Sequence, residues 1–74
     1  MKNIVGPRIR EARYKAGRRV TQEELAARMQ SQGIDIDRSA ISKIETGKRP
    51  VTDFEVVAIC QALSIKIAIL FGEE

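Results

Sequence analysis

Cationic and hydroxyl side chains gather on one side of a short segment in the middle of the chain. Ile41 and Ile44 recur there at helical spacing, so they predict a helix with one buried face. The opposite face then carries Arg38, Ser39, Ser42 and Lys43, followed by Thr46. Cations and hydroxyl groups of modest bulk suit the edges of base pairs in a DNA major groove. A helix face that is simply solvated would have the same composition, so this helix alone leaves both interpretations open.

The segment that carries these side chains has a recognisable start and end. Asp37 is a preferred N-cap residue, and Gly47 can adopt the left-handed conformation that ends a helix. Together they predict a helix from Arg38 to about Thr46. The basic residues Lys48 and Arg49 follow in a loop that a proline separates from the next element.

An earlier helix should pack beside this one. Thr21 and Glu24 form a capping box, which predicts a helix from Gln22 to Gln30 or Gln32. The connection that follows, from Gln30 to Ile36, is either an added helical turn or an extended loop. Two isoleucines in this connection alternate with aspartates, so they can hold it against a core.

The rest of the chain also predicts helices. The first should run from near Pro7 to Lys15 or Ala16, and the fourth from the cap at Thr52 to about Ala62. The fourth is apolar almost all round, so we expect it to be buried on more than one side. A short fifth helix, about Ile67 to Phe71, would close an all-α fold of five helices. The 74 residues predict one domain, residues 1–74, in which residues 1–4 form a loose arm.

Four blocks of this sequence resemble the phage repressor and Cro type of helix-turn-helix. They are GPRIREAR, TQEELA, ISKIETGKRP and a final ALSI–LF, in that order, and they cover roughly Val5 to Phe71. The resemblance implies a compact five-helix bundle of the Xre-like family, whose members are usually transcriptional regulators that bind DNA as dimers. The segment Arg38 to Thr46 would then lie in the major groove, with Arg38, Ser39, Ser42 and Lys43 reading bases.

The resemblance also assigns roles to residues outside that face. It implies a structural ion pair between Arg13 and Glu45, and a DNA phosphate contact from Gln22 at the start of the second helix. Thr46, Lys48 and Arg49 should also lie over phosphates, where they give affinity but no sequence information. Arg18 and Arg19 lie in a longer connection than the family pattern has, and they either reach the DNA backbone or remain in a solvated loop.

The C-terminal end is unusually apolar for so small a domain. We expect a homodimer through the fourth and fifth helices, because a chain of 74 residues cannot bury all of these side chains alone. The expected interface residues are Ile67, Ile69, Leu70 and Phe71. The competing interpretation is that they only complete the monomer core. Lys66 occupies a position where the family usually has a capping residue, which leaves the start of the fifth helix open.

Composition argues against several other classes of protein. The chain has no histidine and one cysteine, so it predicts no metal site, no disulfide and no cofactor, and it lacks the motifs of an enzyme. No small-molecule ligand is expected. No segment is long and apolar enough to cross a membrane, and no signal peptide is apparent, so we expect a cytoplasmic protein without a membrane partner.

Charge is distributed unevenly along the chain. Residues 1–49 contain twelve Lys and Arg against six Asp and Glu, whereas residues 50–74 contain one cation against four anions. This polarity favours an anionic partner for the first two thirds, and we expect double-stranded DNA. A protein-interaction module, such as an antitoxin or adaptor with the same fold, is the alternative. Scarce aromatic residues disfavour RNA, and the lack of a basic amphipathic stripe disfavours a membrane surface.

Overall fold

The computed structural model describes residues 4–72, and this part of the chain contains five helices and no strand. They are α1 (Gly6–Lys15), α2 (Gln22–Gln30), α3 (Arg38–Glu45), α4 (Asp53–Leu63) and α5 (Ile67–Leu70). The all-α prediction is confirmed, and each predicted helix is present within a residue or two of its predicted ends. Of the predicted loose arm, residues 1–3 lie outside the described residues, and Ile4 is exposed.

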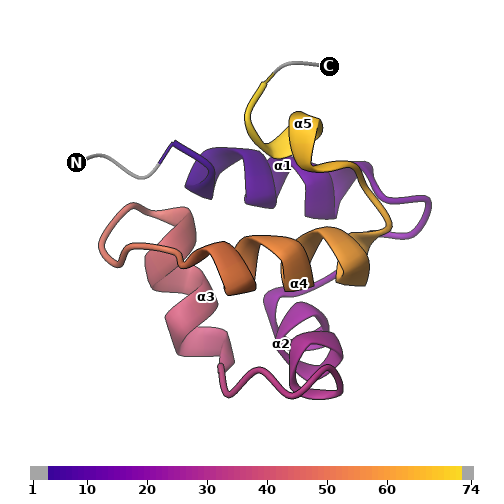
Figure 1. The fold of residues 1–74 in the computed structure, drawn as a ribbon. Helices are drawn as coiled ribbons and strands as arrows, with labels where there is room; N and C mark the ends of the chain where they lie inside the picture. The colour runs from indigo at the N-terminus through magenta and orange to yellow at the C-terminus, as the bar shows by residue number, and fades with distance from the viewer. Residues whose placement is uncertain (1–3, 73–74) are drawn as a thin grey trace.

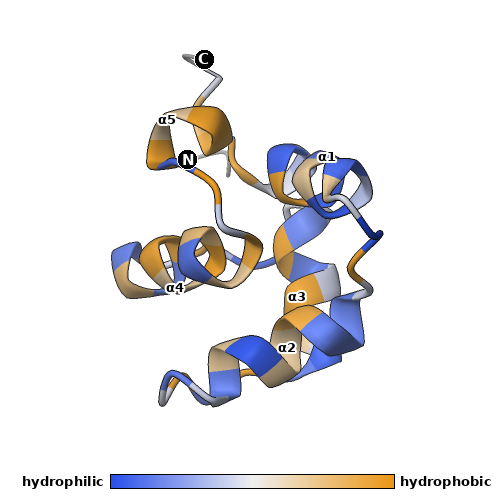
Figure 2. Cartoon of the chain, turned by 90° about the vertical axis from the view of Figure 1, so that its right-hand side faces the viewer, coloured by the Kyte–Doolittle hydropathy of each residue, from blue (hydrophilic) through white to orange (hydrophobic). Residues whose placement is uncertain are grey.

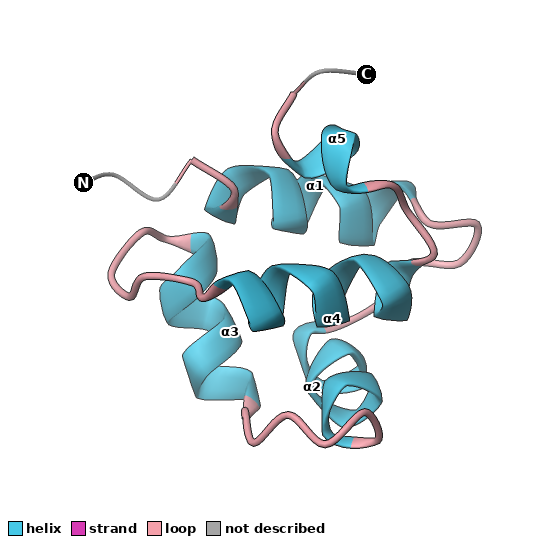
Figure 3. Cartoon of the chain, in the orientation of Figure 1, coloured by secondary structure: helices cyan, strands magenta, loops and turns pink. Residues whose placement is uncertain are grey.

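Helix α4 contacts three of the other four helices, α1, α2 and α5. It packs against α1 and α5 on one side and against α2 on the other (Figure 1). Helices α2 and α3 contact each other and stand across the α1–α4 pair, while α5 covers the opposite side of α1 (Figure 3). No helix in the described part of the chain is long and apolar enough to span a bilayer.

Side chains fix where three of the helices begin. Thr21 accepts a hydrogen bond from the Glu24 amide, and Thr52 does the same for Glu55, so both capping boxes form. Asp37 caps α3 by accepting a hydrogen bond from the Ala40 amide at 2.8 Å. The φ angle of Gly47 is +78°, the left-handed conformation expected after α3.

The connection between α2 and α3 is an extended loop, which settles the alternative left open by the sequence. Ile36 is buried and Ile34 is partly buried, so the loop is held to the core as expected. Two glutamine side chains add to this: Gln30 Nε2 donates to the Ile36 carbonyl at 2.7 Å, and Gln32 Nε2 donates to the Ala58 carbonyl at 3.0 Å. The loop therefore links α2, α3 and α4.

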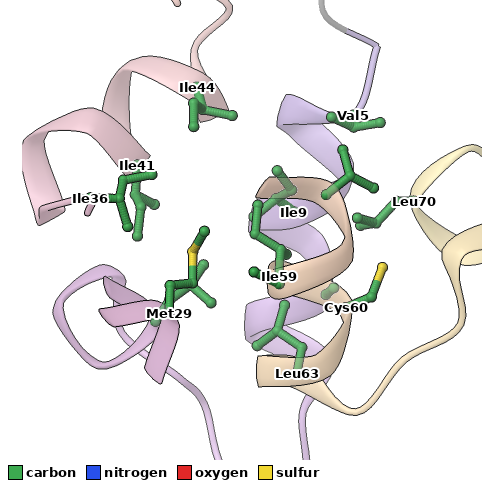
Figure 4. Packing of buried hydrophobic residues seen from close by; sticks show 14 of the residues in the cluster. Val5, Ile9, Met29, Ile36, Ile41, Ile44, Ile59, Cys60, Leu63 and Leu70 are labelled. Carbon is green, nitrogen blue, oxygen red and sulfur yellow. The ribbon is translucent and has the colours of Figure 1, made fainter. Parts of the chain in front are cut away.

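Apolar side chains from all five helices meet in one core. Ile9 of α1, Met29 of α2 and Ile59 of α4 point into the same interior region (Figure 4). Ile41 and Ile44 of α3 are 1% exposed, so their burial fixes which face of α3 remains outside. The core is small, and each large side chain therefore contributes a sizeable part of its stability.

Leu70 belongs to this core, which corrects its assignment to a dimer interface. Its side chain is 0% exposed and lies near Val5 and Ile9 (Figure 4). Helix α5 is a single turn, in which Leu70 is buried, Ile69 is partly buried and Ile67 is exposed. Lys66 precedes α5 without a side-chain cap, and packing rather than capping holds this turn in place.

The start of α1 packs tightly on the end of α3 through Gly6. A Cβ atom at this position would lie 2.4 Å from the Ile44 carbonyl oxygen and 3.1 Å from that of Glu45. Both neighbours are backbone atoms, so neither can rotate away. A side chain at position 6 would separate the first helix from the third.

We expect Gly6→Ala to lower the free energy of unfolding by about 1–3 kcal/mol, as overpacking does elsewhere. Gly17→Ala is the matched control, because nothing lies within 4 Å of a Cβ there and its φ is not positive. That control should be neutral or raise stability by about 0.4–1 kcal/mol. Urea unfolding of both variants measures the difference, and equal stabilities would contradict the close approach of α1 to α3.

Candidate nucleic-acid interface

A buried ion pair joins α1 to α3. Arg13 Nε donates to Glu45 Oε2 at 2.7 Å, and Arg13 Nη2 donates to Glu45 Oε1 at 2.9 Å. Both side chains are nearly inaccessible, at 6% and 3% exposure. Two parallel hydrogen bonds between planar groups fix orientation as well as distance. The structure thus brings together the two residues that the sequence paired.

The same pair also holds the start of α2. The remaining guanidinium nitrogen, Arg13 Nη1, donates to the Val20 carbonyl at 2.9 Å, just before the cap of α2. Gln22 Nε2 donates to Glu45 Oε1 at 3.1 Å. The side chain of Gln22, expected on a DNA phosphate, is instead turned toward Glu45. Its position still marks the start of α2, where backbone amides face outward.

The outer face of α3 presents the side chains expected to read bases. Arg38, Ser39 and Lys43 are exposed, and Ser42 is partly buried. Within residues 4–72, no hydrogen bond or ion pair is formed by the side chains of Arg38 and Lys43, so both are free to bind a ligand. A helix of eight residues with its apolar face buried and this face exposed has the size and polarity for a major groove.

The residues after α3 divide into two groups. Lys48 is exposed, and Thr46 is exposed although its hydroxyl donates to the Ser42 carbonyl at 3.0 Å. Arg49 instead pairs with Glu55, with hydrogen bonds of 3.1 and 2.9 Å from its two terminal nitrogens. Arg49 thus has a structural role, in which it joins the loop to α4, and the phosphate contact expected for it stays a prediction.

This second ion pair was not foreseen from the sequence. The Arg49 guanidinium beside Glu55 lowers the pKa of that carboxyl, and the capping bond from Thr52 lowers it further. The pairing raises the pKa of Arg49 in turn. A signal was present, because the capping box already places Glu55 over the start of α4, close to the preceding basic loop.

The two arginines of the α1–α2 connection have different partners. Arg18 Nη2 donates to Glu24 Oε2 at 2.9 Å, at an exposed site. The first-turn bond from Thr21 lowers the pKa of Glu24, with the Arg18 charge as a smaller cause. Arg19 lies instead over the ring of Tyr14, with its guanidinium carbon 4.8 Å from the ring centroid. Arg19 therefore lies over the ring of Tyr14, whereas Glu24 holds Arg18 at the start of α2.

Apolar side chains remain exposed on α4 and α5. Phe54 is 76% exposed, Ile67 49%, Val57 45% and Phe71 43%. The expectation that α4 is buried on more than one side therefore holds only in part. Figure 2 colours α5 and part of α4 as hydrophobic, and Ile69, which lies within α5, is partly buried. Of the expected interface residues, Ile67 and Phe71 are the accessible ones.

The geometry defines a class: a small helical domain with a polar, basic helix face supported by a buried ion pair. The helix-turn-helix family model matches residues 9–70. The chain therefore belongs to the helix-turn-helix family, in the Xre-like branch of phage repressor and Cro proteins, which is a family of DNA-binding regulators.

A solved structure agrees with this assignment. The chain is similar to the restriction-modification controller protein C.AhdI from Aeromonas hydrophila, with 31% sequence identity and a TM-score of 0.78. The similarity covers 93% of this chain and 91% of that one. A comparison with curated proteins finds no match.

The ion pair yields a direct test. Replacing either Arg13 or Glu45 with Ala should cost about 3–5 kcal/mol, because the partner is left as a buried unpaired charge. The double variant should cost much less than the sum of the two. Arg18→Ala and Glu24→Ala form the control cycle on an exposed pair, where coupling should be close to the measurement error. Additive losses at Arg13 and Glu45 would rule out the buried pair as the link between α1 and α3.

Proposed function

We propose that this protein is a transcriptional regulator that binds specific sites on double-stranded DNA with α3 in the major groove. The observation that carries the proposal is the exposed face of α3, on which two unpaired cations and two hydroxyls stand opposite two fully buried isoleucines. Family membership and the similarity to a controller protein support it.

Arg38 and Lys43 are proposed to select bases. Both have long side chains with several donors, and guanine presents two acceptors, O6 and N7, in the major groove. Ser39 and Ser42 are shorter, so they reach a base or a nearby phosphate only at close approach. Burial of Ile41 and Ile44 supports this assignment because it prevents α3 from rotating about its axis.

Contacts with the DNA backbone are proposed for residues around the exposed face of α3. Lys48 is exposed after α3, and Thr46 lies at the end of the helix. The start of α2, at Gln22, supplies the positive end of a helix dipole. Such contacts place the protein on the duplex without selecting its sequence.

A homodimer is proposed through the exposed apolar side chains of α4 and α5. Exposed apolar surface of this kind marks association sites, and a second copy of the chain supplies a matching surface by two-fold symmetry. A dimer would present two copies of α3 to successive major grooves, about 34 Å apart along the duplex.

The same apolar surface favours a second candidate function. An antitoxin or adaptor could use Phe54, Val57, Ile67 and Phe71 to bind another protein, with or without DNA. The salt dependence of binding to random duplex DNA separates the two. Affinity should fall steeply as salt rises if phosphates are bound, and a pure protein-binding module should show no such dependence.

Amino-acid substitutions can separate the reading of bases from the binding of the DNA backbone, once an operator has been selected. Arg38→Ala or Lys43→Ala should weaken the specific site by about 1–3 kcal/mol and relax preference at one position. Lys48→Ala should instead weaken all duplexes alike and lower the salt slope by about one unit. Binding-site selection followed by titration of operator and random duplexes measures both effects. Equal losses on the two duplexes for Arg38→Ala and Lys43→Ala would contradict base reading.

The proposed dimer is testable by placing a charge in its surface. Ile67→Asp should raise the dimer dissociation constant by at least about tenfold, equivalent to about 1.4 kcal/mol. Ala27→Asp, at an exposed position of α2, is the matched control and should leave association unchanged. Sedimentation equilibrium with and without operator measures the effect. A wild-type protein that stays monomeric at high concentration in both conditions would exclude the dimer.

A further inference from the structure

Three arginines surround the ring of Tyr14 on the outer side of α1. The guanidinium carbons of Arg19, Arg13 and Arg10 lie 4.8, 5.4 and 5.6 Å from the ring centroid. Tyr14 is 48% exposed, so the cluster is open to solvent. Stacking of cations on an aromatic face orders side chains that would otherwise be mobile.

Arg10 and Arg19 carry charges that no neighbouring acid neutralises. Arg13 is paired with Glu45, but in residues 4–72 neither Arg10 nor Arg19 forms an ion pair with a carboxylate. A hydrogen bond with Arg10 and the charge of Arg19 lower the pKa of Tyr14, which reports a positive local potential. Like charges held close together repel each other, so an anion between them would relieve the repulsion.

The cluster borders a hollow that continues to the α3 face. This hollow has a volume of about 530 Å³, and Arg10, Tyr14 and Arg19 lie on one side of it. Arg38, Ser42 and Thr46 lie on another, and the first turn of α2 closes it. Glu23 is the one unpaired carboxylate among its described lining residues, so cations prevail. A DNA strand lying along α3 would pass this hollow.

We infer that Arg10, Tyr14 and Arg19 form a phosphodiester site that holds the DNA backbone beside the strand read by α3. Both guanidiniums are planar, multi-donor groups suited to phosphate oxygens, and the Tyr14 hydroxyl adds a donor. The site extends the contact from α3 to α1. This inference rests on the proposed DNA-binding function.

Stacking of an unpaired base on Tyr14 is the competing use of the cluster. Such stacking normally takes several aromatic residues along a groove. Here the ring is surrounded by cations and is the single aromatic side chain lining the described hollow. Phosphate is therefore the better match.

The first test compares salt dependence. Each phosphate contact contributes about 0.9 to the slope of log affinity against log salt. The proposed site holds one phosphate, so Arg10→Ala with Arg19→Ala should lower the slope by about 0.9 for each bound subunit, on operator and random duplex alike. Arg8→Ala is the matched control, because Arg8 lies on α1 beside Gly72, away from the cluster. The control should keep the wild-type slope, and thermal melting checks that all variants fold.

The second test locates the phosphate on the DNA. Single methylphosphonates, which lack the backbone charge, are placed one at a time along the operator. At one position per half-site the substitution should weaken wild-type binding about tenfold and leave the Arg10→Ala, Arg19→Ala protein unaffected. Tyr14 is the chain's single tyrosine and there is no tryptophan, so a change in tyrosine fluorescence with intact duplex should disappear at that same substituted position.

The outcomes separate the two proposals. If wild-type protein binds duplex DNA but the double variant keeps its slope, or Arg8→Ala lowers the slope equally, the phosphate site is wrong and the DNA-binding function stands. If no single methylphosphonate is coupled to the double variant, a discrete site is likewise excluded. If the wild type binds no duplex with a salt dependence, both proposals fail.

Discussion

The buried contact between Arg13 and Glu45 is the interaction on which the arrangement of the first three helices depends. Its hydrogen bonds join α1 to α3, a third bond reaches the Val20 carbonyl before α2, and Gln22 completes the set. A buried charge pair is costly to desolvate and adds little net stability when compared with apolar residues. Its value here is geometrical, because the bidentate pairing permits one relative orientation of α1 and α3.

Packing also supports this orientation. Gly6 lets the start of α1 approach the Ile44 carbonyl, and Ile41 and Ile44 fill the core from the same helix. The long α2–α3 connection does not loosen the arrangement, because Ile36 and two glutamine side chains hold it to neighbouring elements. Helix α3 is therefore fixed at both ends and along its inner face, which leaves only its polar face available to a ligand.

The cations that are available to a ligand are those without a carboxylate partner in the protein. Arg13, Arg18 and Arg49 are each paired with a glutamate, so they stabilise the domain and contribute little to its outward field. Arg10, Arg19, Arg38 and Lys43 have no such partner among the described residues, and they lie around α1 and α3. A net charge of +3 is thus a poor guide to the field, because it counts paired and unpaired cations alike.

The sequence by itself determined the helices and the face of α3, because capping residues and apolar spacing act over a few residues. It also predicted the fold and paired Arg13 with Glu45, through the resemblance to a known family. Only the tertiary structure decided which side chains have partners within the protein and which are available to a ligand. Gln22 turned to Glu45, Arg49 to Glu55, and Leu70 into the core, because partners distant along the chain set each choice. The cluster around Tyr14 has the same origin: Arg10 shares its helix, but Arg19 arrives from a loop whose path is fixed by tertiary contacts.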